Sequence, residues 1–212
     1  MNAYYAARAQ EYDRIYAKPE RQRDLRAIER WLPDVLQGRV VLEVACGTGY
    51  WTQFLAAAAR QVLAVDASTE VLRIAQSRVT DSHARFVLGD AYRLPVPGSS
   101  FDGAFAGFWF SHVPVARIGE FLRGLHQALV PGAKVVLLDN RFVEGRSTPI
   151  ADHNADGNTF QLRSLEDGSM HRVLKNFPSR HALCQAVRAA ASEVRYHEWQ
   201  YFWALEYDLA SP

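Results

Sequence analysis

The segment Val40–Gly49 constrains the fold of this 212-residue chain more than any other. Its first residues, Val-Val-Leu-Glu-Val, have the β-branched and aliphatic character of a strand buried in a parallel sheet. They lead directly into Ala-Cys-Gly-Thr-Gly, a glycine-rich turn, and a helical pattern follows. Because glycine lets the backbone approach a ligand closely, this unit predicts a binding site where the strand ends.

The pattern that surrounds this segment alternates strands with helices. Before it, we expect two helices over residues 3–17 and 20–36, separated by Pro19, with Pro33 kinking or ending the second. Such alternation predicts a parallel sheet with crossover helices, and hence the α/β class. The expected strands are 39–45, 61–65, 84–88, 101–106 and 134–138, and the expected helices are 49–59, one beginning at Ser68 or Thr69, and 115–129, which Pro131-Gly132 stops.

The last third of the chain departs from this alternation. Strand-like runs at 159–165 and 170–175 flank an Asp-Gly dipeptide, which is typical of a β-hairpin. Ser179 can cap a helix that extends to about Ala191. Two aromatic-rich strands are expected at 194–199 and 201–208. We expect one domain over residues 1–212.

Charge and cysteine content narrow the classes of function. Lys and Arg number 24 and Asp and Glu 23, and no basic stripe is present, so a nucleic-acid partner is not expected. The two cysteines, Cys46 and Cys184, suggest neither a disulfide framework nor a metal site, and Asp152-His153-x-x-Asp156 lacks a fourth spaced ligand. With no signal-peptide pattern and no apolar run of about 18 residues, we expect a cytoplasmic protein without a membrane partner.

Two acidic residues are predicted at the ends of neighbouring strands. Asp66 ends the second strand, 17 residues after Gly49, and Asp90-Ala91 follows the third. In open α/β sheets, ligands bind at the carboxyl ends of the strands. An acid about 20 residues beyond a glycine turn typically accepts hydrogen bonds from a ribose, so we interpret these positions as a nucleoside-binding site.

The residues Glu43-x-x-x-Gly47-x-Gly49 resemble motif I of the class I S-adenosylmethionine (SAM)-dependent methyltransferases, E/D-x-x-x-G-x-G. The resemblance covers most of residues 38–140 and is closest to the small-molecule branch (methyltransferase types 11 and 25), including members of quinone biosynthesis. It implies a Rossmann-like, doubly wound, mostly parallel seven-stranded sheet with an antiparallel last strand. The hairpin at 159–175 is then an insertion.

The resemblance also implies roles for individual residues. An N-terminal helical lid over 1–36 would precede a SAM-binding core at 38–140, and a substrate-side insertion and the final strands would occupy 141–212. Tyr4-Tyr5 and Glu11-Tyr12-Asp13 resemble the lid segment of small-molecule members. The residues expected to bind the cofactor SAM are Tyr12, Glu43, Ala45, Gly47, Gly49, Asp66, Ala67, Asp90, Ala91 and Phe108. Cys46 is expected to fill space beside the cofactor.

The fourth strand is followed by Gly-Phe-Trp-Phe-Ser-His, not by the Asn/Asp-Pro-Pro-Tyr/Phe tetrad that resembles nucleobase and glutamine methyltransferases. The aromatic cluster suggests a small planar or apolar acceptor that is methylated on O, N, S or C. Residues expected to contact it are Tyr4, Tyr5, Trp109, His112 and Arg141. His112 is the candidate catalytic base, with Tyr12 as a second catalytic candidate. His112 could instead serve as a hydrogen-bonding residue, and Arg141 could bind a substrate anion or pair with Asp139 or Glu144.

Two alternative functions stay open. A nicotinamide-dependent oxidoreductase would need a third glycine to complete G-x-G-x-x-G, and position 52 is Thr52. A non-catalytic SAM-binding protein is poorly excluded, although a substrate-sized cavity would count against it. A monomer or a homodimer is expected, because the aromatic residues of 199–203 could form core or a dimer edge.

Overall fold

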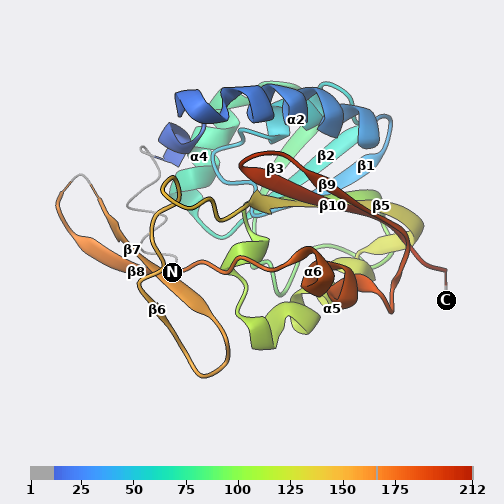
Figure 1. Ribbon diagram of the computed structural model, residues 1–212. Helices are drawn as coiled ribbons and strands as arrows, with labels where there is room; N and C mark the ends of the chain where they lie inside the picture. The colour runs from blue at the N-terminus through green and yellow to red at the C-terminus, as the bar shows by residue number, and fades with distance from the viewer. Residues whose placement is uncertain (1–11, 166, 212) are drawn as a thin grey trace.

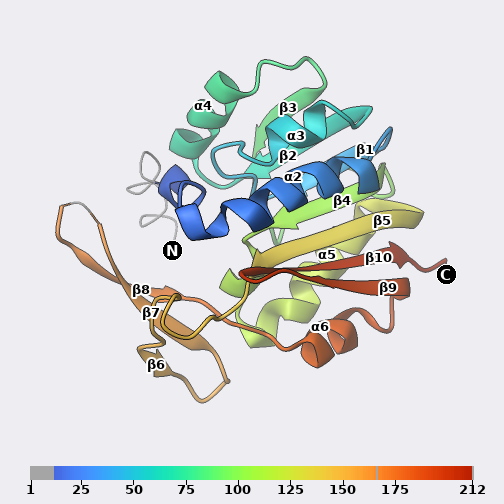
Figure 2. The same cartoon turned by 45° about the horizontal axis from the view of Figure 1, so that its top comes forward.

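The computed structural model describes residues 12–165 and 167–211 (Figures 1 and 2). Its centre is a seven-stranded sheet in the order β3-β2-β1-β4-β5-β10-β9. The strands are β1 (Val40–Val44), β2 (Gln61–Asp66), β3 (Ala84–Leu88), β4 (Phe101–Gly107), β5 (Leu129–Asn140), β9 (Ala191–Glu198) and β10 (Phe202–Leu209). Strands β1 to β5 run parallel, whereas β10 is antiparallel to both β5 and β9. The predicted mostly parallel sheet with an antiparallel last strand is confirmed.

Helices cover both faces of this sheet (Figure 1). Helices α2 (Gln22–Val35), α3 (Thr52–Ala56) and α4 (Thr69–Arg78) pack on one face, and α5 (Ile118–Gln127) and α6 (Arg180–Val187) on the other. Short 3-10 helices are η1 (Tyr12–Ile15), η2 (Pro19–Arg21), η3 (Phe110–His112) and η4 (Val115–Arg117). Each face buries its own hydrophobic cluster, so the central strands are apolar on both sides.

Several predicted boundaries are wrong. The helix expected over 49–59 is only α3, because the glycine turn continues to Trp51 before the helix begins. Pro131-Gly132 does not separate a helix from a strand; it lies inside β5, where the pairing with β4 shifts register. α6 ends at Val187 instead of near Ala191, where β9 begins. The end of the second helix agrees with the expected residue 36 to within one residue, since α2 ends at Val35, but Pro33 lies inside α2 and does not end it. Of the helix expected over 3–17, residues 3–11 lie outside the described ranges, and Tyr12–Ile15 form η1.

The predicted hairpin is confirmed as β7 (Thr159–Ser164) and β8 (Met170–Leu174). A third strand, β6 (Asp152–His153), pairs with β7, so the insertion is a small antiparallel sheet. Figures 1 and 2 both place this small sheet at the end of the molecule where α2 begins. The insertion therefore lies beside the carboxyl ends of the parallel strands.

The aromatic residues of the last strand belong to the core. Tyr201, Phe202 and Trp203 are each buried, and β10 lies between β5 and β9 instead of at an edge. They therefore stabilise the sheet and do not form the dimer edge that the sequence left open. Within residues 12–165 and 167–211, no helix has both the length and the apolar character needed to cross a membrane.

Candidate active site

The turn after β1 brings backbone close to α4. Ala45, Gly47 and Gly49 have φ angles of 56°, 59° and 76°, and the Gly49 N–H donates to the Cys46 carbonyl at 3.1 Å. A Cβ atom on Gly49 would lie 3.1 Å from both Cα and Cβ of Ala75. Glycine is therefore needed at position 49 for its backbone angle and for the close approach of α4.

Asp66, the last residue of β2, fixes the conformation of this turn. Its Oδ2 accepts a hydrogen bond from the Gly47 N–H at 2.9 Å, and its Oδ1 accepts one from the Ser68 N–H at 3.0 Å. Burial raises the pKa of the carboxyl group, while backbone N–H donors, that of Gly47 first, act in the opposite direction. The carboxylate thus connects β1 to β2 at the edge where both strands end.

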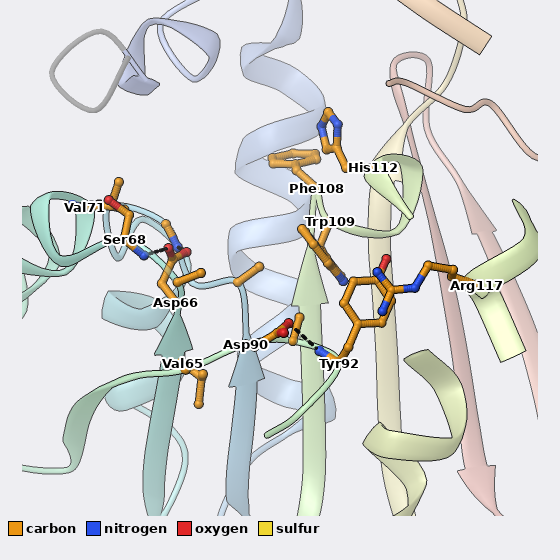
Figure 3. Close-up of a pocket in the computed structure, with 15 residues that line it drawn as sticks. Val65, Asp66, Ser68, Val71, Asp90, Tyr92, Phe108, Trp109, His112 and Arg117 are labelled. Carbon is orange, nitrogen blue, oxygen red and sulfur yellow. Dashed lines mark hydrogen bonds between the residues drawn. The ribbon is translucent and has the colours of Figure 1, made fainter. Parts of the chain in front are cut away.

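A cavity of about 380 Å³ opens at this edge (Figure 3). Asp66 and Ser68 lie on one side of it, and Tyr92, Trp109 and Arg117 on the other. The predicted cofactor and substrate residues that line it are Ala45, Gly47, Asp66, Ala67, Asp90, Ala91, Phe108, Trp109 and His112. Residues from the ends of four strands therefore meet in one concave site, as the topology predicts.

The side of the cavity after β3 combines a hydrogen-bonding backbone with a flat wall. Asp90 Oδ1 accepts a hydrogen bond from the Tyr92 N–H at 2.9 Å, and the Arg117 guanidinium lies 3.5 Å from the centre of the Tyr92 ring. The indole N–H of Trp109 is buried and makes no hydrogen bond to the described residues. The flat wall on this side suits a flat heterocycle.

The opposite end of the cavity is formed by Phe108 and His112, directly after β4 (Figure 3). Phe108 has a φ of 57°, and its ring packs 5.6 Å from that of Phe202. His112 is 5% exposed, and its Nδ1 lies 2.6 Å from the Leu174 carbonyl oxygen. A carbonyl oxygen can only accept, so Nδ1 donates and neutral His112 has its lone pair on Nε2.

A buried ion pair holds the insertion against this wall. Lys175 Nζ lies 2.8 Å from Asp139 Oδ1 and 2.6 Å from Ser111 Oγ, and the Lys175 and Asp139 side chains are 3% and 0% exposed. Asp139 Oδ2 also accepts the Ser111 N–H at 2.9 Å. Because Ser111 and Leu174 adjoin His112 and Lys175 in sequence, the same contacts fix the position of the His112 ring.

Glu43 lies behind the turn instead of in the cavity. It is 1% exposed, and its Oε2 makes no hydrogen bond in the described part of the chain. Burial raises its pKa to about 8, partly opposed by the Thr52 hydroxyl. Burial likewise raises the pKa of the Cys46 thiol, so Cys46 is a neutral space-filling residue rather than a nucleophile.

Five other predicted positions lie away from the cavity or outside the residues that the structure describes. Arg141 donates to the Trp199 carbonyl at 2.7 Å and pairs with Glu198 at 3.2 Å, so its predicted partners, Asp139 and Glu144, are wrong. Gly49 supports the turn from behind and does not line the cavity. Tyr4 and Tyr5, and the side chain of Tyr12, lie outside the described residues.

The sequence reasoning missed Ser68, Val71 and Arg117 in the cavity wall, and Lys175 behind it. Val71 and Ser68 follow Asp66 into α4, so the strand-end rule could have found them. Arg117 and Lys175 reach the site through tertiary packing and left no local signal. Among residues 12–165 and 167–211, no group of three or more His, Cys, Asp or Glu side chains could hold a metal ion.

Comparison with known proteins agrees with this geometry. Residues 41–132 match a family model described as a methyltransferase domain. A solved structure titled as the DhpI-SAM-HEP complex is 30% identical and covers 96% of this chain and 94% of its own, with a TM-score of 0.76. The DhpI-SAH complex is 29% identical and covers 100% and 96% of the two chains, with a TM-score of 0.81.

A curated relative, the demethylmenaquinone methyltransferase of Geobacillus sp. (strain WCH70), is 27% identical over 143 residues. The match covers 60% of this chain and 60% of that protein. The chain spans about half to three fifths of the length of the curated relatives that it matches. The family match spans β1 to β4 and the first residues of β5, whereas the insertion that holds β6, β7 and β8 lies outside it.

Proposed function

We propose that this chain, which belongs to the class I SAM-dependent methyltransferases, transfers the methyl group of SAM to a small-molecule acceptor. One observation supports this most: a strand-end carboxylate, a glycine turn and a buried histidine border the same cavity. A flush surface beside His112 would have favoured a protein that only binds SAM. Thr52 occupies the position at which the nicotinamide fingerprint G-x-G-x-x-G has its third glycine, and it is buried in the first turn of α3. This segment therefore gives no support to a nicotinamide site.

The residues of the cavity fit SAM group by group. Asp66 can accept hydrogen bonds from both ribose hydroxyls, since its carboxylate lines the cavity. The backbone of Ala45 and Gly47 can hold the amino-acid part, and Asp90-Ala91 with Tyr92 can hold the adenine. Glu43 would act only through the turn, because it does not reach the cavity.

The protein residues supply positioning, exclusion of water and proton transfer. When bound, SAM supplies an electrophilic methyl group on a sulfonium centre. The ring of Phe108 forms an apolar part of the cavity end beside His112 and would help to keep water from the reacting atoms. His112 Nε2 can accept a proton from an O–H, N–H or S–H acceptor, with the ring held by Leu174. For an acceptor that needs no deprotonation, alignment of the acceptor atom with the methyl group and the sulfur would be enough to accelerate methyl transfer.

Much of the acceptor side lies outside residues 41–132, the part of the chain that matches the methyltransferase family model. His112 contacts the end of β8, and Lys175 connects β8 to β5, whereas the family match ends at residue 132. The substrate in the relatives' name, demethylmenaquinone, therefore cannot be assigned directly to this chain. We infer a small metabolite as the acceptor and retain the prediction of a monomer or homodimer in the cytoplasm.

Formation of S-adenosylhomocysteine (SAH) from SAM tests this function. The purified protein is incubated with SAM and a panel of phenols, amines, thiols, quinols and small acids, and product is quantified by mass spectrometry. We expect acceptor-dependent SAH formation that is lost in Asp66→Ala and strongly reduced in His112→Ala. Binding of SAM without turnover on any acceptor class would favour the non-catalytic alternative, and NADH binding instead of SAM would favour the oxidoreductase.

A further inference from the structure

Three cationic side chains lie on the acceptor side of the molecule. Arg21 ends η2 immediately before α2, and its guanidinium carbon lies 5.7 Å from the centre of the Tyr201 ring and 5.9 Å from that of Phe202. Phe202 in turn packs on Phe108, which borders the cavity. A continuous path of contacts thus joins the Arg21 guanidinium to the end of the cavity that Phe108 and His112 form.

Arg163 and Lys175 approach the same region from the insertion. In the antiparallel register of β7 and β8, Arg163 lies opposite His171, and Gln161 lies opposite Val173. These four side chains are on the same face of the small sheet. Gln161 and Val173 are only 2% and 3% exposed, so this face of the small sheet points into the molecule. Lys175 continues the ladder on the same face, since its N–H donates to the Thr159 carbonyl at 2.9 Å. Because Leu174, which contacts His112, directly precedes Lys175, this inward face of the small sheet leads toward His112.

The positive charges of this region are incompletely neutralised. Lys175 has Asp139, but Arg21 makes no hydrogen bond or ion pair within the described part of the chain, and its Nε is buried. Among the described residues, Arg163 donates only to the Gln161 side-chain oxygen, at 3.2 and 2.8 Å. Within the part of the chain that the structure describes, exposed Glu20 is the acid whose charge raises the pKa of Arg21.

The electrostatic effects of the three cations on one another agree with this proximity. Burial lowers the pKa of Arg21, and the Arg163 charge lowers it further. Burial also lowers the pKa of Lys175, and the charges of Arg163 and Arg21 add to that effect. A half-buried arginine without an anionic partner destabilises the folded protein. Arg21 also lies at the N-terminus of α2, where the positive end of the helix dipole disfavours a cation.

We propose that Arg21 and Arg163 bind an anionic group of the methyl acceptor, a carboxylate or a phosphoryl-type oxyanion, and so direct the acceptor toward His112. The guanidinium fork matches such oxyanions with two parallel hydrogen bonds. Both residues lie outside residues 41–132, the part of the chain that matches the methyltransferase family model. The inference rests on the proposed function, since it names the substrate class of the same site.

Titration of the SAH-loaded protein with inorganic phosphate and with acetate tests this assignment by calorimetry. We expect phosphate or acetate to bind, with at least about tenfold weaker affinity in Arg163→Gln and in Arg21→Gln. The anion that binds with the higher affinity indicates which oxyanion the acceptor carries. Arg163→Lys retains the charge and should lose less affinity than Arg163→Gln.

Arg172→Gln is the matched control. Arg172 lies on the outer face of the same hairpin and pairs with Asp152 at 2.7 Å, so its loss should change anion affinity less than about twofold. The inference is overturned if the SAH-loaded protein binds neither anion, or if Arg163→Gln behaves like Arg172→Gln. SAH affinity is measured in every variant and should not change. Failure of the wild-type protein to bind SAH would overturn the proposed function itself.

Discussion

Replacement of Glu43 by glutamine tests the interpretation of the motif I acid as a buried, protonated support for the turn. Glutamine has the shape of a protonated glutamate but cannot ionise. Glu43 is 1% exposed and has no cationic partner among residues 12–165 and 167–211, and its pKa is raised from 4.5 to about 8. At neutral pH the folded protein should therefore keep Glu43 protonated, whereas the unfolded chain ionises it.

The sign and size of the effect follow from this difference. The folded state binds the proton more tightly than the unfolded state, so the stabilisation is fully present below the unfolded pKa and is lost as pH rises through the folded pKa. Each pKa unit corresponds to about 1.4 kcal/mol. The wild-type free energy of unfolding should thus fall, relative to Glu43→Gln, by about 1.4 kcal/mol per pH unit between about pH 5 and 8.

The assay is urea denaturation of both proteins at four pH values, followed by tryptophan fluorescence and circular dichroism. Glu120→Gln is the control, because Glu120 is an exposed acid whose pKa is lowered by its hydrogen bond to Arg117. Any pH dependence that Glu120 contributes should appear only below about pH 5 and with the opposite sign. A wild-type minus Glu43→Gln difference that is flat from pH 5 to 8 would refute the reasoning.

Three further predictions concern the wall of the cavity and the turn. His112→Ala should lower kcat by about 10²-fold or more on an acceptor that requires deprotonation, with SAM affinity changed less than about twofold; equal turnover would remove His112 as the base. Lys175→Met should destabilise the protein by about 3–5 kcal/mol in urea, because Asp139 is left buried without its partner, and adding Asp139→Asn should recover part of that loss. If the double variant is no more stable than Lys175→Met alone, the ion pair does not hold the insertion. Gly49→Ala should cost more stability than Gly132→Ala, since both have a φ of 76° but only a Cβ at position 49 would meet α4; equal losses would contradict the close approach.

The parts of the site that the sequence predicts are those fixed by local pattern and strand topology. The turn at Gly47 and the acids Asp66 and Asp90 follow strands that are identifiable from their apolar runs. Parallel strands end at one edge, so these residues had to meet there. That rule gave most of the cavity without any knowledge of side-chain contacts.

The direction in which a side chain points within a central strand was beyond the same reasoning. Glu43 stands between Leu42 and Val44 in a strand that is buried on both faces, so no alternation of apolar and polar residues indicates its environment. The matching motif predicted cofactor contact, and the structure places the carboxyl group behind the turn. The prediction that Pro131-Gly132 separates a helix from a strand failed for a similar reason, because a dipeptide typical of turns also occurs at an irregularity inside a strand.

Contacts between distant segments were also not predictable. Lys175 and Asp139 are far apart in the chain and belong to the insertion and to β5. Neither hydrophobic periodicity nor a motif encodes how an inserted hairpin docks on a sheet. The same is true of Arg21 and Arg163, whose neighbourhood depends on how α2 and the small sheet approach one end of the molecule.

Calorimetric titration of SAM into the wild-type protein and into Asp66→Ala tests the central claim most directly. The account predicts micromolar binding to the wild-type protein and an affinity lower by about ten- to a hundredfold in the variant, because a charge-assisted contact of about 1.5–3 kcal/mol is lost. Asp66→Asn, which keeps the side-chain shape, should weaken binding in the same direction. Absence of SAM binding, or equal affinity in wild type and Asp66→Ala, would contradict the assignment of this cavity as the SAM site.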